Sequence, residues 1–247
     1  MCLSNKIINH YRQVFLRAIN EQAADQNCLR NPKTDFSRHR KLNKMDFIRI
    51  PNHLTDKSLS TSLPKIFTSS PIVSAAAISR ARSKIRSDTY VKVFHSFNQA
   101  TKSSDSAKYK SHRLIAVDGS EIDVLAHKDN PAAYARTKKG EYRNYYHLNA
   151  AFDTLNHVFI DAVVQPGSLK NEDQALLELS DSEFLDTDDI LTCDRGYESL
   201  LTFHRLENKG MKYLIRIKDQ TSAISLLKHY PTPDTEEYDI PFEVILT

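Results

Sequence analysis

Two aspartates stand at the ends of apolar runs in this sequence of 247 residues. Asp118 follows the run LIAV at 114–117, and Asp194 follows the run ILTC at 190–193. Short apolar runs of this kind predict buried strands, so each carboxylate is expected at the end of a strand. Two acids held on such a rigid platform can share divalent metal ions, which suits the cleavage and transfer of phosphodiester bonds.

Each aspartate also has a purely structural interpretation. Asp118 is followed by a glycine and a serine, small residues that leave room for a metal and a phosphate, but Asp-Gly is also a common turn pair. Asp194 precedes Arg195-Gly196-Tyr197, where Gly196 would let the chain turn into a helix that Asp194 could simply cap. Its neighbour Cys193 is expected as a small buried residue rather than a nucleophile.

The remaining acids are expected to be structural. Asp123 lies at odd spacing from Asp118 and would face the other side of a regular strand. Asp153 belongs to an expected hairpin turn, and Glu172 and Asp173 fall in the first turn of a helix, where negative charge is favourable anyway. The ten histidines form no zinc pattern, and neither a nucleotide-binding glycine loop nor a serine-hydrolase motif occurs.

The composition is that of a water-soluble protein. Apolar residues make up 40% of the chain, and no apolar run approaches the length of a membrane span. Three widely spaced cysteines form neither a disulfide framework nor a zinc pair, which predicts a reducing cytoplasm.

The net charge of +3 conceals a division of the chain. Residues 1–117 contain 21 Lys and Arg against 7 Asp and Glu, whereas residues 118–247 contain 13 against 24. A basic half joined to an acidic half favours a module that binds DNA or RNA, although a solvated basic surface without a partner would look the same.

The first half is expected to be helical. Helices are predicted over 5–22, 45–50, 71–85 and 88–98, with 55–65 irregular and a domain linker within 101–110. Ser70 would cap the third helix and Pro71 would occupy its first position. The end of that helix is basic, and we expect the following residues to bind DNA: Arg80, Arg82, Lys84 and Arg86.

From residue 113 onward the pattern predicts strands and then alternating helices and strands. Strands are expected over 113–118, 121–125, 145–152, 157–164, 189–194, 211–217 and 238–246, and helices over 171–180 and 198–208. This order predicts an α/β fold with a mixed sheet flanked by helices.

A stretch that mixes cations with tyrosines, 136–146, lies between the expected strands. Its Lys138, Lys139 and Arg143 could contact phosphates while tyrosines stack on bases, or the tyrosines could pack against the sheet. Arg195 and Tyr197, beside Asp194, complete the expected set of DNA contacts.

Several of these pieces together resemble the DDE transposases of bacterial insertion sequences, of the insertion-sequence-four type group. The matching pieces, in family order, are the basic helix 73–85, the strand 114–120 with its acid, the paired strands 145–164, Gly167 followed by Asn171-Glu172, the motif Asp194-Arg195-Gly196-Tyr197, and the segment 210–218. The strand-Asp-Arg-Gly-Tyr-helix piece is the most specific of them.

The resemblance implies a nuclease domain of RNase H-like fold at 111–247, preceded by a helical DNA-binding region at 1–110. Asp118 and Asp194 would hold two Mg²⁺ ions, or Mn²⁺ in their place, for cleavage at transposon ends and transfer to target DNA. It further implies DNA partners (terminal inverted repeats and target), a homodimer that bridges two ends, a bacterial cytoplasmic location and no nucleotide cofactor.

One part of the family pattern is missing. The third carboxylate of the group lies on a later helix, in the motif Tyr-x-x-Arg-x-x-x-Glu-x-x-x-x-x-x-Lys. Tyr213 has Arg216 three residues on, but Gln220 stands where the glutamate is needed. We therefore expect a truncated transposase, or alternatively a non-catalytic DNA-binding fragment that inhibits or derives from a full-length enzyme. A phosphatase is disfavoured, because Ser120 replaces the second aspartate of that motif.

Overall fold

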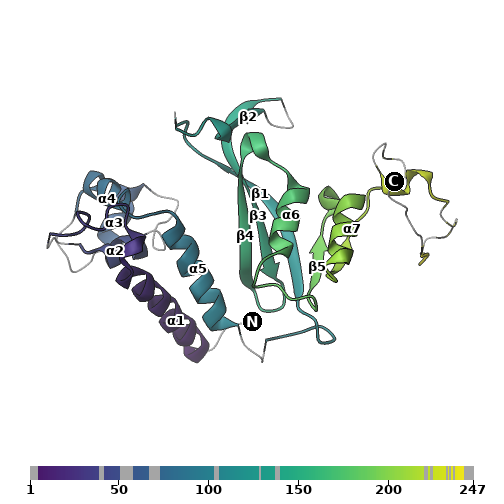
Figure 1. The fold of residues 1–247 in the computed structure, drawn as a ribbon, viewed down its shortest axis with the longest axis horizontal. Coiled ribbons are helices and arrows are strands. Elements are labelled where there is room, and N and C mark those ends of the chain that lie inside the picture. The colour runs from purple at the N-terminus through teal and green to yellow at the C-terminus, as the bar shows by residue number, and fades with distance from the viewer. Residues whose placement is uncertain are drawn as a thin grey trace. The chain divides into compact units, whose positions relative to one another are not determined.

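The computed structural model describes residues 5–38, 42–50, 58–66, 73–102, 106–127, 129–136, 140–219, 222, 225–231, 233, 235 and 237–241. The chain forms two compact units, Met1–Asp105 and Ser106–Thr247 (Figure 1). Each unit has its own apolar core.

The first unit is helical and is built on α1 (Asn5–Ala24). Apolar residues recur along α1 at helical spacing, which buries Val14, Ala18 and Ile19 on one face. That helix packs against α5 (Asp88–Thr101), where the rings of Phe15 and Phe97 meet edge to face at 6.0 Å. These two helices and α2 (Lys44–Arg49) confirm the helices expected at 5–22, 88–98 and 45–50.

Two expectations for this unit are wrong. Residues 59–66 form α3 (Leu59–Ile66), although their serines, threonine and Pro64 predicted irregular chain; burial of Leu63 in the core outweighs the weak helix propensity. The next helix, α4 (Ala75–Arg82), begins later than expected, because Ser74 accepts a hydrogen bond from the N–H of Ala77 and caps it. Ser70 and Pro71 lie outside the described residues.

The second unit is a six-stranded sheet in the order β2-β3-β1-β5-β6, with β4 also paired to β3. Its strands are β1 (Leu114–Asp123), β2 (Tyr134–Arg136), β3 (Tyr142–Asp153), β4 (Val158–Pro166), β5 (Ile190–Cys193) and β6 (Lys212–Ile215). Strand β3 is antiparallel to β1, β2 and β4, whereas β5 is parallel to β1 and β6. The predicted α/β class with a mixed sheet is confirmed.

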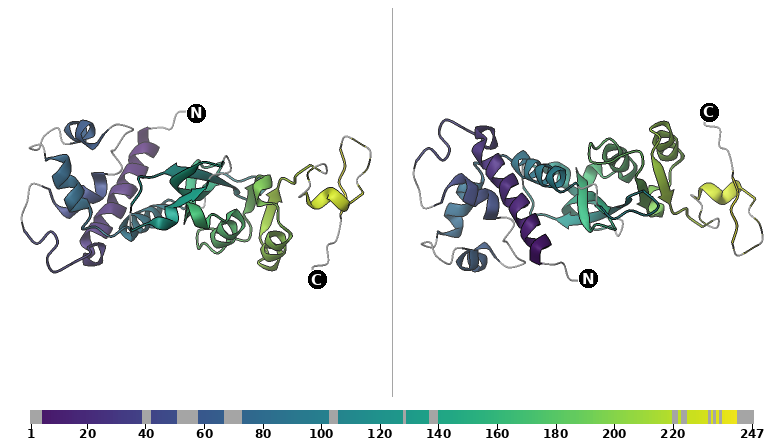
Figure 2. Two further views of the ribbon diagram at one scale, coloured as in Figure 1. Left: turned by 90° about the horizontal axis from the view of Figure 1, so that it is seen from above. Right: turned by 90° about the horizontal axis from the view of Figure 1, so that it is seen from below.

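Two helices pack on the sheet, α6 (Glu172–Ser180) and α7 (Leu200–Asn208). Both views of Figure 2 place them on the same side of the strands. Their Leu176, Leu179 and Leu206 are fully buried in one core with Ile115 and Leu191 of the sheet. The apolar runs before Asp118 and Asp194 therefore owe their strand character to this shared core.

The strand boundaries differ from expectation at three places. Residues 114–123 form one strand and not two, since Gly119 pairs with Asn149 and carries β1 through the expected turn. The short strand β2 had no apolar alternation to predict it. Residues 238–241 are in no strand, and the rest of the candidate strand at 238–246 lies outside the described residues. The hairpin turn is confirmed, because Asp153 Oδ1 accepts the N–H groups of Leu155 and Asn156.

A buried ion pair joins the beginnings of β1 and β5. The Arg113 guanidinium donates to both carboxylate oxygens of Asp189, at 2.8 and 2.5 Å, and also to the carbonyl of Phe184 at 2.9 Å. Arg113 and Asp189 are 9% and 3% exposed. Since Arg113 precedes Asp118 and Asp189 precedes Asp194 by five residues each, this pair fixes the register in which Asp118 and Asp194 meet.

Candidate active site

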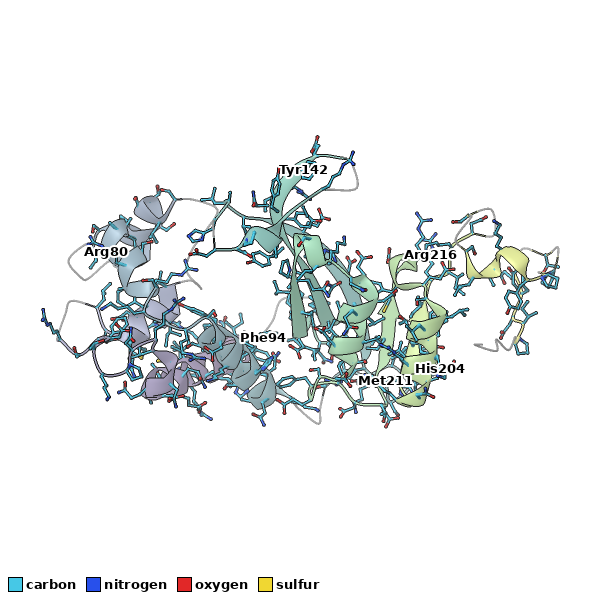
Figure 3. All side chains as sticks on the ribbon, turned by 45° about the horizontal axis from the view of Figure 1, so that its top comes forward. Arg80, Phe94, Tyr142, His204, Met211 and Arg216 are labelled. Atoms are coloured by element: carbon cyan, nitrogen blue, oxygen red, sulfur yellow. The ribbon has the colours of Figure 1, made fainter. Side chains whose placement is uncertain are left out.

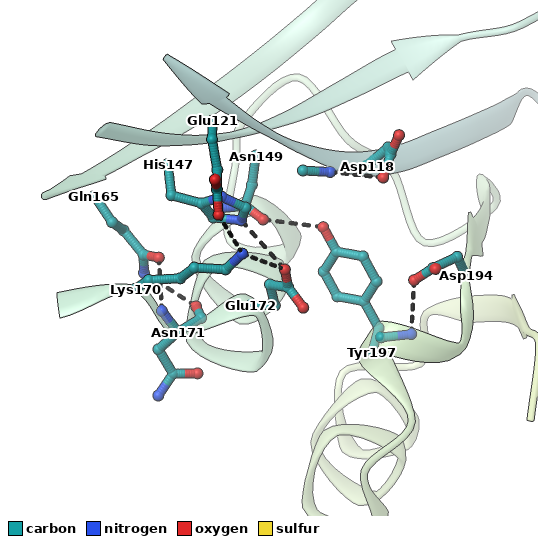
Figure 4. A network of polar contacts seen from close by, with 12 residues as sticks. Asp118, Glu121, His147, Asn149, Gln165, Lys170, Asn171, Glu172, Asp194 and Tyr197 are labelled. Carbon is teal, nitrogen blue, oxygen red and sulfur yellow. Dashed lines mark hydrogen bonds and ion pairs between the residues drawn. The ribbon is translucent and has the colours of Figure 1, made fainter. Parts of the chain in front are cut away.

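The structure brings Asp118 and Asp194 together where β5 ends beside β1 (Figure 4). Strands β1 and β5 run parallel with Val117 opposite Cys193, and each aspartate is the next residue along its strand. Neighbouring strands lie about 4.8 Å apart, so the two residues are adjacent. Both are exposed, which leaves the carboxylates open to a metal ion and to DNA.

Each carboxylate has one oxygen held by the backbone. Asp118 Oδ1 accepts the N–H of Gly119 at 2.8 Å, and Asp194 Oδ1 accepts the N–H of Gly196 at 2.6 Å. Asp194 thus does cap the short helical turn Arg195–Tyr197, as the structural interpretation held. Capping occupies one oxygen and leaves Oδ2 for chemistry, so the two interpretations of Asp194 are compatible.

Side chains approach closely at Gly119, directly after Asp118, and at Gly196, two residues after Asp194. A Cβ on Gly119 would lie 2.7 Å from the buried ring of His147, so this glycine admits a core side chain and does not open a pocket for phosphate. A Cβ on Gly196 would meet Asp194 Oδ1 at 2.8 Å and Glu172 Oε2 at 3.1 Å. Gly196 does not adopt the left-handed backbone conformation, so its role in the turn is to make room for carboxylates.

Cys193 is a buried strand residue, as expected. Burial raises the pKa of its thiol to about 12, and the negative charge of Asp194 adds to the effect. The thiol therefore stays protonated at neutral pH and is unsuited to nucleophilic attack.

Tyr197 has a different role from the expected DNA contact. Its side chain is 1% exposed, so the ring cannot stack on a base in this structure. Its hydroxyl donates a 2.9 Å hydrogen bond to Oδ1 of the fully buried Asn149, which lies opposite Gly119 in the sheet. Burial raises the pKa of the Tyr197 phenol well above its usual range, and the charges of Glu172, Asp118 and Asp194 raise it further. Tyr197 therefore ties the turn after Asp194 to the strand beside Asp118.

Glu172 is the residue of this site that sequence reasoning missed. It begins α6, and its Oε1 lies 3.1 Å from Lys170 Nζ and 3.4 Å from His147 Nε2. Lys170 also pairs with Glu121 of β1, which completes a polar layer between sheet and helix (Figure 4). Glu172 follows Asn171 in a pair that forms part of the family resemblance, but favourable charge at a helix start is a sufficient explanation of it in the sequence.

The expected DNA contacts fall in both units. Arg80 and Arg82 are exposed on α4 (Figure 3 labels Arg80), and Arg195 is exposed beside Asp194. Lys84 pairs with Asp35 at 3.5 Å, and Arg86 pairs with Asp88 at 3.0 Å, so both are partly neutralised.

The stretch 136–146 gives a mixed result. Arg143 pairs with Glu121 and Asp123, which reduces its availability for phosphate. Tyr134 and Tyr142 stack with their centroids 5.4 Å apart and are 54% and 62% exposed, and Figure 3 shows Tyr142 on this projecting hairpin. Tyr145 is instead buried, as in the packing interpretation. Lys138 and Lys139 lie outside the described residues.

The donor chemistry of the two aspartates fits Mg²⁺ or Mn²⁺. Carboxylate oxygens are the ligands that these hard ions prefer, and Mg²⁺ keeps several waters while binding one or two carboxylates and substrate phosphates. Within the described ranges, no three His, Cys, Asp or Glu side chains stand close enough to hold an ion together.

A mixed sheet flanked by helices, with acids on adjacent parallel strands, is the arrangement of RNase H-like nucleic-acid enzymes. The sequence model of the transposase DDE domain matches residues 109–242, more than half of the chain. The chain therefore belongs to the transposase DDE domain family. No curated protein matches it. Among the described helices, none combines the length and hydropathy that a membrane span requires.

Family membership sets the general function. Transposase DDE domains act on DNA in transposition and use divalent metal ions. The chain thus belongs to a class of DNA-cleaving proteins. At the level of the family, DNA is the partner and a divalent metal ion is the cofactor, as expected.

Proposed function

We propose that this chain holds Mg²⁺, or Mn²⁺ in its place, with Asp118 and Asp194, and cleaves DNA at transposon ends before joining them to target DNA. The observation that carries the proposal is the parallel register of Val117 with Cys193, which makes the two acids neighbours on a sheet of the matching family. Bound ions would activate the attacking water or 3′-hydroxyl and stabilise the leaving 3′-oxygen.

In this proposal, neighbouring residues of the chain orient the two carboxylates. The backbone N–H groups of Gly119 and Gly196 orient the two carboxylates, and the Tyr197–Asn149 hydrogen bond ties the turn after Asp194 to β3, the strand paired with β1. The exposed Arg195 is placed to contact a DNA phosphate beside Asp194.

The helical region at 1–110 is the proposed binding module for the terminal inverted repeats, with Arg80 and Arg82 as its exposed cations. Residues 111–247 form the proposed catalytic domain. The Asp-Arg-Gly-Tyr motif supports assignment to the insertion-sequence-four type group, and with it a bacterial cytoplasmic setting and a homodimer that bridges two ends.

A cleavage assay tests the proposal. The full chain is incubated with labelled duplexes that carry the inverted repeats read from its flanking DNA, with Mg²⁺, Mn²⁺ or chelator. We expect metal-dependent nicking at the ends that Asp118→Asn and Asp194→Asn each reduce to background, while the exposed Asp188→Asn leaves it intact. Cleavage that persists in both variants would contradict the assignment of Asp118 and Asp194 as the catalytic acids.

A second candidate is a chain that binds transposon ends without cutting them. The observation that motivates this alternative is Gln220, which stands where the Tyr213–Arg216 spacing calls for the glutamate of the Tyr/Arg/Glu/Lys motif. Specific binding of the end duplexes, with no nicking by the unaltered chain in either metal, would support the binding role over the enzyme.

A further inference from the structure

A cavity of about 960 Å³ lies in the helical unit, between the segment 33–38 and α4. All of its lining residues belong to the first unit, so the cavity is a feature of that unit alone. Its volume is at the upper end of the range for small-ligand sites, about 300–1,000 Å³. The cavity is therefore large enough for a flat organic group together with a charged one.

The floor of the cavity, formed by Phe36, Leu42 and Phe47, is apolar. The two phenylalanine rings lie with their centroids 5.4 Å apart, and Leu42 and Phe47 are buried. Ala77 and Ala81 of α4 also line the cavity, and their methyl groups add apolar surface without filling the space. A floor of aromatic and aliphatic groups favours a flat ligand such as a nucleic-acid base.

The rim of the cavity, formed by Lys33, Arg38, Arg80 and Lys84, is basic. Lys84 Nζ is paired with Asp35 at 3.5 Å. The other three cations are exposed, and none of them forms an ion pair with an acid that the structure describes. The described lining itself contains no Asp or Glu. An apolar floor inside a basic rim is complementary to a ligand that carries both a flat body and negative charge.

The backbone at Phe36 supports a binding role for the floor. Its φ of 55° lies in the left-handed region, which is uncommon for a bulky residue. The buried Asp35 holds this turn, because its Oδ2 accepts the N–H of Asn31 at 3.0 Å and its own N–H donates to the Asn31 carbonyl at 2.8 Å. Strained backbone that its surroundings maintain is concentrated at binding sites. Core packing explains the strain less well, since the Phe36 side chain is only partly buried.

We propose that this cavity binds single-stranded DNA, with one unpaired base on the floor and the neighbouring phosphates on Lys33, Arg38 and Arg80. DNA is the partner of the family to which the chain belongs, and proteins bind unpaired strands through cations and aromatic side chains together. The site is separate from Asp118 and Asp194. It rests on the function proposed above only in taking DNA as the polyanion.

Duplex DNA matches the cavity less well. Its bases are stacked inside the double helix, so a duplex could lay only its backbone across the rim and would leave the apolar floor unused. A small inorganic anion would likewise contact the cations and not the rings. A strand with an exposed base is complementary to both the rim and the floor.

Fluorescence anisotropy of the full chain with a labelled single strand tests the two parts of the site. Lys33→Ala combined with Arg38→Ala is expected to weaken binding of the strand about tenfold. Arg12→Ala with Arg17→Ala removes equal charge from exposed sites on α1 and is expected to bind the strand like the unaltered chain. An abasic strand of the same length keeps its phosphates and is expected to bind about tenfold more weakly, because base stacking is lost.

Crosslinking locates the base. Iodouracil in the strand crosslinks on irradiation to an aromatic side chain that stacks on it, and mass spectrometry identifies the modified residue. The expected site is Phe36. Phe36→Leu keeps an apolar side chain and is expected to abolish the crosslink while the circular dichroism spectrum stays native. Crosslinks confined to other segments, no crosslink, or equal affinity for the abasic strand would overturn the inference.

The same measurements separate this inference from the proposed function. If the chain binds duplexes that carry the transposon ends but does not bind single strands, the cavity is not a DNA site and the proposed function stands. If the chain binds DNA in neither form, the proposed function fails together with the inference.

Discussion

At the scale of single residues, Tyr197 shows how one hydrogen bond can align the two aspartates of the proposed site. The phenol leaves the turn after Asp194 and reaches Asn149, which lies opposite Gly119 in the sheet. Because both partners are buried, the bond has no competition from water. We expect the position of Asp194 relative to Asp118 to depend on it.

Tyr197→Phe removes the hydroxyl and leaves Asn149 Oδ1 buried without its donor. We expect the free energy of unfolding to fall by about 1–3 kcal/mol, the cost of an unsatisfied buried acceptor. Urea denaturation of the variant measures this. Tyr213→Phe is the matched control, because its hydroxyl donates to the exposed Glu207; an equal loss of stability in the two variants would contradict the buried role of Tyr197.

Gly119→Ala places a Cβ 2.7 Å from the His147 ring. That ring is 1% exposed and cannot move aside into solvent, so we expect overpacking to cost about 1–3 kcal/mol. Thermal unfolding by calorimetry checks the result against Ser120→Ala, the exposed neighbouring position. An unchanged melting temperature for Gly119→Ala would show that the strand accommodates the methyl group.

At the scale of elements, the parallel pairing of β1 with β5 creates the site. The Arg113–Asp189 ion pair fixes that pairing at one end, and the shared core with α6 and α7 holds it from one face. The two strands are consequently held firmly where Asp118 and Asp194 lie side by side.

Asp189→Ala should destabilise the second unit strongly. It leaves the buried Arg113 guanidinium with only the Phe184 carbonyl and the 3.6 Å contact to the exposed Asp186, and breaking a buried ion pair costs about 3–5 kcal/mol. Guanidinium denaturation measures the decrease in stability. Asp188→Ala is the control, since that residue pairs with Lys212 on the surface, and its variant should unfold like the unaltered chain. Equal stability of the two variants would rule out the register-fixing role of Arg113.

Local sequence pattern predicted much of this unit, because apolar runs and helix spacing are local signals. It placed Asp194 at the end of a strand and predicted the α6 and α7 helices correctly, whereas Asp118 lies within β1 and not at its end. It failed where tertiary contacts decide the outcome. Pairing with Asn149 carries β1 through the Asp118-Gly119 turn signal, and the approach of Glu172 to Gly196 is a contact between residues distant in sequence.

At the scale of the whole molecule, the charge division distinguishes the two units. The basic excess of residues 1–117 belongs mainly to the helical unit, and the two aspartates of the proposed metal centre belong to the sheet unit. We expect DNA binding to be dominated by counterion release from the first unit, with cleavage confined to the second.

Arg80→Ala combined with Arg82→Ala should weaken DNA binding and reduce its salt dependence. Removing one cation that neutralises a phosphate lowers the slope of log affinity against log salt by about 0.9. Fluorescence anisotropy of the full chain over a salt series measures both quantities. Arg12→Ala with Arg17→Ala removes equal charge from exposed sites on α1. Indistinguishable slopes in the two double variants would mean that α4 is not the DNA-binding surface.

The central claim, a metal ion held between Asp118 and Asp194, is tested most directly by locating the ion. Fe²⁺ replaces Mg²⁺ in the full chain, and ascorbate with peroxide then cleaves the backbone near the bound iron. The account predicts fragments ending close to residues 118 and 194 that excess Mg²⁺ suppresses. Cleavage at other positions, or cleavage at these positions that Mg²⁺ does not compete away, would contradict it.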